Sequence, residues 1–180
     1  MRRRSGGKPN EVVLRRTLTR LDVFERSLQK AAAWLDELMT RLDWEDRHQT
    51  YEALGVVLHA LRDRLPLRVA VSLGAQLPLL LRGLYYQNWE APGVPEKYRH
   101  VRDFLGRVRA GLREHRLDVL PEDRLVRGVL ELLRSHLSLG ELNEVRRALP
   151  PDLRSLFDAT GSPKSATWLP EERAWDKFLM

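Results

Sequence analysis

The sequence predicts an all-α protein with two tandem repeats of three to four helices packed into one bundle, with an N-terminal helical extension and a short C-terminal tail. Three observations support this fold class. Apolar residues recur every three or four positions along most of the chain, which is the period of one helix face. No strand is evident between them. The sequence also repeats itself at a fixed spacing, which indicates a duplicated unit.

The repeat becomes visible when the sequence is shifted by 72 residues. Residues 54–85 then align with residues 126–157 without a gap, and 11 of the 32 positions are identical. A second block, residues 28–42, aligns with residues 98–112 at a shift of 70. Duplication copies a scaffold first, so the parts without a counterpart are the better candidates for a specific function.

These alignments define the expected domain organisation. A disordered basic arm of residues 1–10 precedes a duplicated helical domain of residues 11–158, and a linker with an aromatic tail occupies residues 159–180. Within the domain, repeat one spans about residues 24–89 and repeat two about residues 97–158. A unit of about 60 residues buries only a marginal core alone. We therefore expect the two halves to superpose and to bury their apolar faces against each other.

The helices of the first repeat follow from their apolar stripes and caps. Asn10 is a good N-cap, and the stripe that follows it continues in steps of three and four to Leu42. This stripe predicts one helix, or two nearly collinear helices, with one face toward a core or a partner. Asp46 caps the next helix, which ends before Pro66. One short helix follows, and another starts at Pro78.

The second repeat shows the same order of elements. A linker at residues 90–96 leads to a helix predicted over residues 98–112, and the next helix opens at Pro121. Ser138 and Glu141 predict a capping box, in which each side chain accepts from a backbone N–H at the start of a short helix. As in the first repeat, a proline opens the last short helix.

The net charge of +6 is confined to the N-terminal end. Residues 1–20 hold seven basic residues and one acidic residue, whereas the rest of the chain holds 24 of each sign. Attraction to a polyanion would therefore start at this end. A solvated terminus without a specific role is the other interpretation. The candidate contacts to nucleic-acid phosphates or anionic lipid headgroups are Arg2, Arg3, Arg4, Lys8, Arg15, Arg16 and Arg20.

Two pairs of arginines recur at equivalent positions of the repeats. Arg62 corresponds to Arg134, and Arg82 corresponds to Arg154. They could form two related anion sites. Their recurrence favours a structural role, in which each stem packs on the core and each guanidinium pairs with a carboxylate or a helix C-terminus.

No pattern in the chain points to an enzyme. None of the five histidines has metal-binding spacing, and the absence of cysteine excludes disulfide frameworks and thiolate metal sites. Neither a glycine-rich phosphate loop nor a nucleophile elbow is evident. His59 and Asp63, four residues apart, are expected to form an ordinary hydrogen-bonded pair on a helix surface. We therefore predict a protein that is not an enzyme and uses no cofactor or metal.

The expected location is the cytoplasm. No signal peptide is evident, and the most apolar run, Val69–Leu81, is too short to span a bilayer. The lack of cysteine fits a reducing compartment. Isoleucine is absent and arginine outnumbers lysine 26 to 5, which indicates the codon bias of a GC-rich bacterial genome.

Aromatic residues gather at two places. Tyr85 is expected to close the first unit as Phe157 closes the second, whereas Tyr86 and Trp89 can belong either to this plug or to a partner surface. The C-terminal tail is rich in aromatics for a disordered end. We expect it to dock on its own bundle or, as the second choice, on a partner through Trp168, Leu169, Trp175 and Phe178.

The ordered motifs of the first repeat resemble a known family. Tyr51–Leu54, Val57–Pro66, Leu73–Pro78 and Leu81–Tyr86 are similar to a bacterial family catalogued only as domain of unknown function 2267. The resemblance covers roughly Phe24–Phe157. It implies a cytoplasmic, all-helical and internally duplicated domain, and it brings no activity and no catalytic residue.

The sequence as a whole favours a non-catalytic interaction or regulatory protein that docks a protein partner or a second copy of itself. The alternative is an accessory nucleic-acid-binding protein that uses the basic arm and the first helix. A third possibility is a carrier of a small apolar ligand between the repeats.

Overall fold

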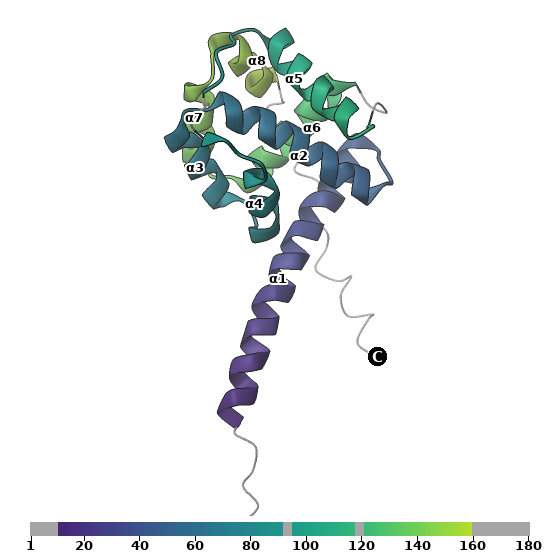
Figure 1. The fold of residues 1–180 in the computed structure, drawn as a ribbon, viewed down its shortest axis with the longest axis vertical. Helices are drawn as coiled ribbons and strands as arrows, with labels where there is room; N and C mark the ends of the chain where they lie inside the picture. The colour runs from purple at the N-terminus through teal and green to yellow at the C-terminus, as the bar shows by residue number, and fades with distance from the viewer. Residues whose placement is uncertain (1–10, 92–94, 118–120, 160–180) are drawn as a thin grey trace, which may run out of the picture.

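The structure is a computed structural model that describes residues 11–91, 95–117 and 121–159, with side chains for residues 22–158 of these ranges. The described residues form eight α-helices and no strand, which confirms the all-α prediction (Figure 1). The helices are α1 (Glu11–Leu42), α2 (Arg47–Arg64), α3 (Leu67–Gln76), α4 (Leu79–Tyr86), α5 (Val101–Glu114), α6 (Glu122–His136), α7 (Leu139–Ala148) and α8 (Pro151–Ala159).

The helices pack into one bundle with one core. Helix α2 contacts α1, α4, α5 and α6, while α3 packs on α7 and α5 packs on α8. Helices from the two halves of the chain therefore share one core. Leucines from both halves are completely or almost completely buried in it, among them Leu38, Leu54, Leu61, Leu125 and Leu133. Each half thus supplies apolar surface that the other half covers.

Helix α1 has two parts with different surroundings. Its C-terminal part, from Ala31 to Leu42, lies in the bundle and packs on α2, α4 and α6. Its N-terminal part continues beyond the bundle as a single projecting helix (Figure 1). The stripe that the sequence predicts along this helix is therefore divided between the core and the outside of the bundle.

The arginines that recur in the sequence make recurring hydrogen bonds. Arg62 donates to the carbonyl of Tyr85, and Arg134 donates to the carbonyl of Phe157 at 3.3 Å. These partners are also 72 residues apart. Each carbonyl lies near a helix C-terminus, where the last turn has no intrahelical donor.

The second pair of arginines behaves in the same way. Arg82 Nη2 donates to the carbonyl of Ala75 at 2.7 Å, and Arg154 Nη2 donates to the carbonyl of Arg147 at 3.1 Å. Both acceptors belong to the last turns of short helices, α3 and α7. These contacts therefore support a structural role for the recurring arginines, in which each guanidinium pairs with the end of a helix.

One predicted helix start is wrong. The helix expected from residue 98 begins at Val101. Tyr98 lies before it and is held against α2, since Arg64 Nε donates to the Tyr98 carbonyl at 2.9 Å and Tyr98 Oη donates to the Ala60 carbonyl at 3.5 Å. These contacts with α2 hold the chain before α5 in a non-helical course.

The three predicted caps have different outcomes. Asn10, the cap expected for α1, lies outside the described residues. Asp46 caps α2 as expected, because its carboxylate accepts from the backbone N–H of Gln49 at 3.0 Å. Ser138 caps α7 by accepting from the N–H of Glu141 at 3.2 Å. The other half of that capping box is missing, since Glu141 Oε1 is buried and has no hydrogen-bond partner among the described residues.

Candidate docking surface

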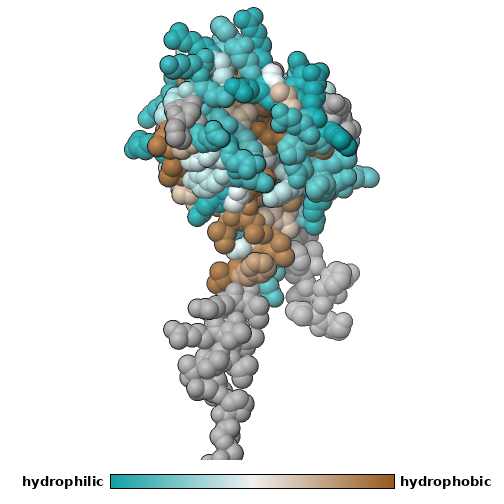
Figure 2. Space-filling view, viewed as in Figure 1, coloured by the Kyte–Doolittle hydropathy of each residue, from teal (hydrophilic) through white to brown (hydrophobic). Residues whose placement is uncertain are grey.

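The projecting part of α1 presents large apolar side chains to solvent. Val23, Phe24 and Leu28 are 53%, 63% and 53% exposed. Figure 2 shows hydrophobic side chains gathered where α1 leaves the bundle. Leu79, on the neighbouring helix α4, is also exposed. We refer to Val23, Phe24 and Leu28 as the exposed α1 face.

This face continues the buried stripe of the same helix. Phe24 and Leu28 share the register of Leu35 and Leu38, because three or four residues separate neighbours along one side of a helix. Leu35 and Leu38 are buried against the bundle. A helix without tertiary packing is only marginally stable in water. An apolar face left uncovered on such a helix therefore suits a binding surface better than a solvated end.

A polar cluster fixes α1 to α6 where the helix enters the bundle. Glu37 accepts hydrogen bonds from Arg41 at 2.6 Å, from Ser135 at 2.7 Å and from His136 at 2.7 Å. The His136 ring stacks on Trp34, with 4.4 Å between centroids. Burial alone raises the pKa of Glu37, but the three hydrogen bonds and the His136 charge together bring it below its ordinary value. This cluster sets the direction in which α1 projects.

The same cluster does not form a nucleophilic site. Ser135 and His136 both bond to the carboxylate of Glu37. In a catalytic triad the imidazole lies between the hydroxyl and the carboxylate and takes the hydroxyl proton. Here the carboxylate lies between the other two groups, so the arrangement serves to hold two helices together.

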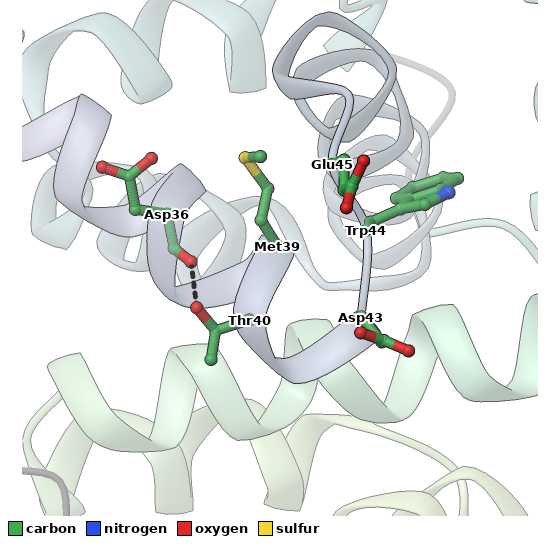
Figure 3. A pocket seen from close by; sticks show the side chains of 6 residues that line it. All are labelled: Asp36, Met39, Thr40, Asp43, Trp44 and Glu45. Carbon is green, nitrogen blue, oxygen red and sulfur yellow. Dashed lines mark hydrogen bonds between the residues drawn. The ribbon is translucent and has the colours of Figure 1, made fainter.

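An open hollow lies at the C-terminal end of α1. It is lined by Asp36, Met39, Thr40, Asp43, Trp44 and Glu45 (Figure 3). Thr40 Oγ1 donates to the carbonyl of Asp36 at 2.8 Å, and the Asp36 carboxylate pairs with Arg47. Within the described ranges, no group of three or more histidine, aspartate or glutamate side chains is arranged to hold a metal ion. The hollow is best described as an acidic surface.

The aromatic group at the end of α4 belongs largely to the fold. Tyr85 is completely buried and its hydroxyl donates to the Ala70 carbonyl at 2.8 Å, as expected of a plug. Tyr86 and Trp89 are half-buried and stack on each other with 5.4 Å between centroids. Their possible role as a partner surface stays a prediction, and they offer less open apolar surface than the exposed α1 face.

The predicted hydrogen bond between His59 and Asp63 is wrong. His59 Nε2 donates to the carbonyl of Leu84 at 2.7 Å, while Asp63 pairs with Arg62 at 2.7 Å. Burial lowers the pKa of His59 below its ordinary value of 6.5, even though the Leu84 carbonyl favours the charged ring. His59 is therefore a neutral donor that joins α2 to the last turn of α4.

We expect the free energy of unfolding to decrease as the pH falls below 6.5. The unfolded chain binds the His59 proton at the ordinary pKa, 6.5, whereas folded His59 binds it at lower pH. The contribution of the neutral ring to the free energy of unfolding is thus complete above pH 6.5. It is lost as the pH falls through the lower pKa that His59 has in the folded state. Urea unfolding between about pH 8 and pH 5.5 measures the decrease, and this range excludes the titration of Glu37.

His59→Gln keeps an amide donor but removes the titration, so its unfolding free energy should depend less on pH than that of the unsubstituted protein. His48→Gln, at an exposed position, is the control. Equal pH dependence in His59→Gln and the unsubstituted protein would contradict the assignment.

The structure leaves most of the predicted site residues undecided. Arg2, Arg3, Arg4 and Lys8, and likewise Trp168, Leu169, Trp175 and Phe178, lie outside the described residues. Arg15, Arg16 and Arg20 belong to the helical backbone of α1, but their side chains are not among those described.

Two features were not singled out from the sequence. The predicted stripe already contained Phe24 and Leu28, but nothing in its period indicated that they lie outside the bundle. The Glu37 cluster joins residues 98 and 99 positions apart, for which the sequence offers no local signal.

Comparisons with known proteins identify a family without assigning an activity. A family model described as "Uncharacterized conserved protein (DUF2267)" matches residues 31–156. The match thus begins at Ala31, where α1 enters the bundle, and the exposed α1 face lies before it. No curated protein matches the chain. In the described part of the chain, no helix has both the length and the apolar character needed to cross a membrane.

Proposed function

Because this chain belongs to the DUF2267 family, whose description names no activity, we propose a function from its geometry: it is a non-catalytic protein that docks a protein partner through the projecting half of α1. The observation that carries the proposal is the exposed α1 face, which continues a buried stripe beyond the bundle. The bundle acts as the support that holds this helix in a defined direction.

Covering this face would contribute free energy to binding. Complete burial of a phenylalanine or leucine side chain contributes about 1.5–3 kcal/mol relative to exposure. Phe24 and Leu28 are both more than half exposed, so a partner can still cover most of their surface. Aromatic anchors at the centre of an interface commonly carry much of its binding energy.

Affinity capture with the full chain tests this proposal. We expect the unsubstituted protein to retain a partner from the lysate of its host in about 0.3 M salt, where exposed charges are screened. Phe24→Ser/Leu28→Ser should lose that partner. The control Leu67→Ser/Leu139→Ser removes two exposed leucines from α3 and α7 and should retain it. Retention by Phe24→Ser/Leu28→Ser, or loss by the control, would contradict docking through α1.

A second candidate function rests on the charge distribution. The entire excess of +6 lies in residues 1–20, which precede the exposed α1 face. An accessory role in nucleic-acid binding would use this end for phosphate contacts, and its affinity would fall steeply with salt. Binding to duplex DNA that survives removal of Arg2–Arg4 together with neutralisation of Arg15, Arg16 and Arg20 would contradict it. The absence of binding near physiological salt would contradict it as well.

We also propose that the two sets of four helices are a tandem repeat. The recurrence of the Arg62 and Arg82 hydrogen bonds at Arg134 and Arg154 supports this organisation. Superposition of the backbone of α2–α4 on that of α6–α8 tests it, with Leu61 and Leu133 expected in equivalent places. The bacterial origin, the cytoplasmic location and the docking of the aromatic tail stay predictions.

A further inference from the structure

We propose that the partner is a second copy of this chain, and that two copies pair the projecting halves of α1 side by side in antiparallel orientation. This inference rests on the proposed docking function and names its partner. Two observations support it: the spacing of leucines along α1, and the way the bundle fills one side of that helix.

Leucines recur along α1 at the spacing of a helix-pairing seam. They occupy every seventh position, at Leu14, Leu21, Leu28, Leu35 and Leu42. Three residues after the second, third and fourth of these leucines, the same helix side holds Phe24, Ala31 and Leu38. A repeat of this kind is typical of two helices that pack along their length.

The C-terminal half of this seam is already filled, whereas Phe24 and Leu28 before it are exposed. Leu35, Leu38 and Leu42 are buried in the bundle, and Leu28 is 53% exposed. Residues 11–30 form about 30 Å of helix. Covering such a length requires another apolar helix of similar length, and a second copy supplies an identical one.

The bundle determines the orientation of the pair. In a parallel pair, the second α1 would continue alongside Leu35 and Leu42 on their seam side. That space is occupied by α6, because a Cβ built on Gly128 would lie 2.7 Å from Leu42 Cδ2. In an antiparallel pair the two bundles lie at opposite ends, and only the first turn of one described α1 approaches the bundle of the other.

The length of the exposed seam determines the register, that is, which residues of the two antiparallel helices lie side by side. In the register that we infer, Phe24 of one copy lies beside Leu21 of the other. Leu28 of the first copy then lies level with Thr17 of the second copy, between Leu14 and Leu21. A shift by one heptad toward the N-terminus would place Leu28 at the level of the polar arm. A shift the other way would drive the second helix into the bundle.

The C-terminal tail is the competing occupant. It follows α8, which lies at the opposite side of the bundle from the projecting part of α1 (Figure 1). Residues 167–180 would form about 21 Å of helix, less than the exposed length of α1. A second copy therefore covers the seam more completely.

Sedimentation equilibrium of the full chain at about 10 µM tests the proposal. We expect a dimer for the unsubstituted protein and for Leu67→Ser/Leu139→Ser, and a dissociation constant raised by about 100-fold or more for Phe24→Ser/Leu28→Ser. A monomer that still captures a host protein through Phe24 and Leu28 would overturn the second copy but keep the docking function. A monomer that captures nothing would overturn both. Dimerisation that appears only after removal of residues 160–180 would show that the tail covers the face, and would overturn the proposal.

Disulfide trapping tests the orientation, because the chain has no native cysteine. A mixture of Thr17→Cys and Leu28→Cys should yield a disulfide between the two variants on mild oxidation, while Leu28→Cys alone should remain unlinked. Efficient linkage of Leu28→Cys to itself would indicate a parallel pair and overturn the antiparallel arrangement.

Discussion

Replacing Arg62 by alanine is expected to destabilise the protein by about 3 kcal/mol. Arg62 is 3% exposed and is one of two buried residues with a polar or charged side chain among the described residues. Its guanidinium donates to the carbonyl of Tyr85, to the carbonyl of Gln87 at 3.1 Å and to Asp63 at 2.7 Å. Alanine would leave two carbonyls at the end of α4 without their donor and a cavity beside the Trp89 ring.

Urea unfolding measures this loss. Arg62→Lys keeps the charge but cannot donate to two carbonyls and a carboxylate from one planar group, so we expect an intermediate loss of stability. Arg68→Ala is the control, because the Arg68 side chain is 85% exposed and lies 3.7 Å from Glu144. Its cost should stay below about 0.5 kcal/mol. An Arg62→Ala protein as stable as Arg68→Ala would show that the end of α4 does not depend on this side chain.

Replacing Gly74 by alanine is expected to cost about 2 kcal/mol. A Cβ at this position of α3 would lie 2.3 Å from Tyr86 Oη and 2.6 Å from Tyr86 Cζ, and 3.0 Å from a ring carbon of Tyr85. Tyr85 is completely buried and bonded to Ala70, so it cannot move aside without disturbing the core. Tyr86 would have to leave its stack with Trp89. The absence of a side chain at Gly74 thus allows α3 and α4 to pack closely.

Gly106 provides a matched control in the interior of α5. No atom lies within 4 Å of a Cβ built there. Gly106→Ala should therefore stabilise the protein by about 0.5–1 kcal/mol through its helix propensity. Thermal and urea unfolding of both variants check the opposite signs. Tyr86→Leu should reduce the cost of Gly74→Ala in a double-mutant cycle, and additive costs would indicate that the Tyr86 ring is not the obstacle.

The family match and the fold agree with what the sequence predicts where the signals are local. Asp46 could be recognised as a cap because its carboxylate reaches a backbone N–H three residues later. The recurrence of Arg62 and Arg82 in the second half favoured a structural role, and their bonds to helix-end carbonyls agree with it. Such signals depend on residues close in sequence or on copies of the same pattern.

The candidate site was predicted less completely. The sequence contains the stripe from Leu14 to Leu42, and it allowed that stripe to face either a core or a partner. It also placed a basic excess at the N-terminal end. It could not divide the stripe at Ala31, because Phe24 and Leu28 have the same spacing and the same apolar character as Leu35.

The amphipathic period and the caps at Asp46 and Ser138 were thus determined by the sequence alone, since each depends on contacts within a few residues. The tertiary structure decided which part of α1 is covered, because α4 and α6 come from distant parts of the chain. It likewise decided that His59 bonds to Leu84 rather than Asp63, and that Glu37 bonds to His136, 99 residues away. The partner of a polar group and the cover of an apolar face depend on which helices meet in space, and that is a property of the packed chain.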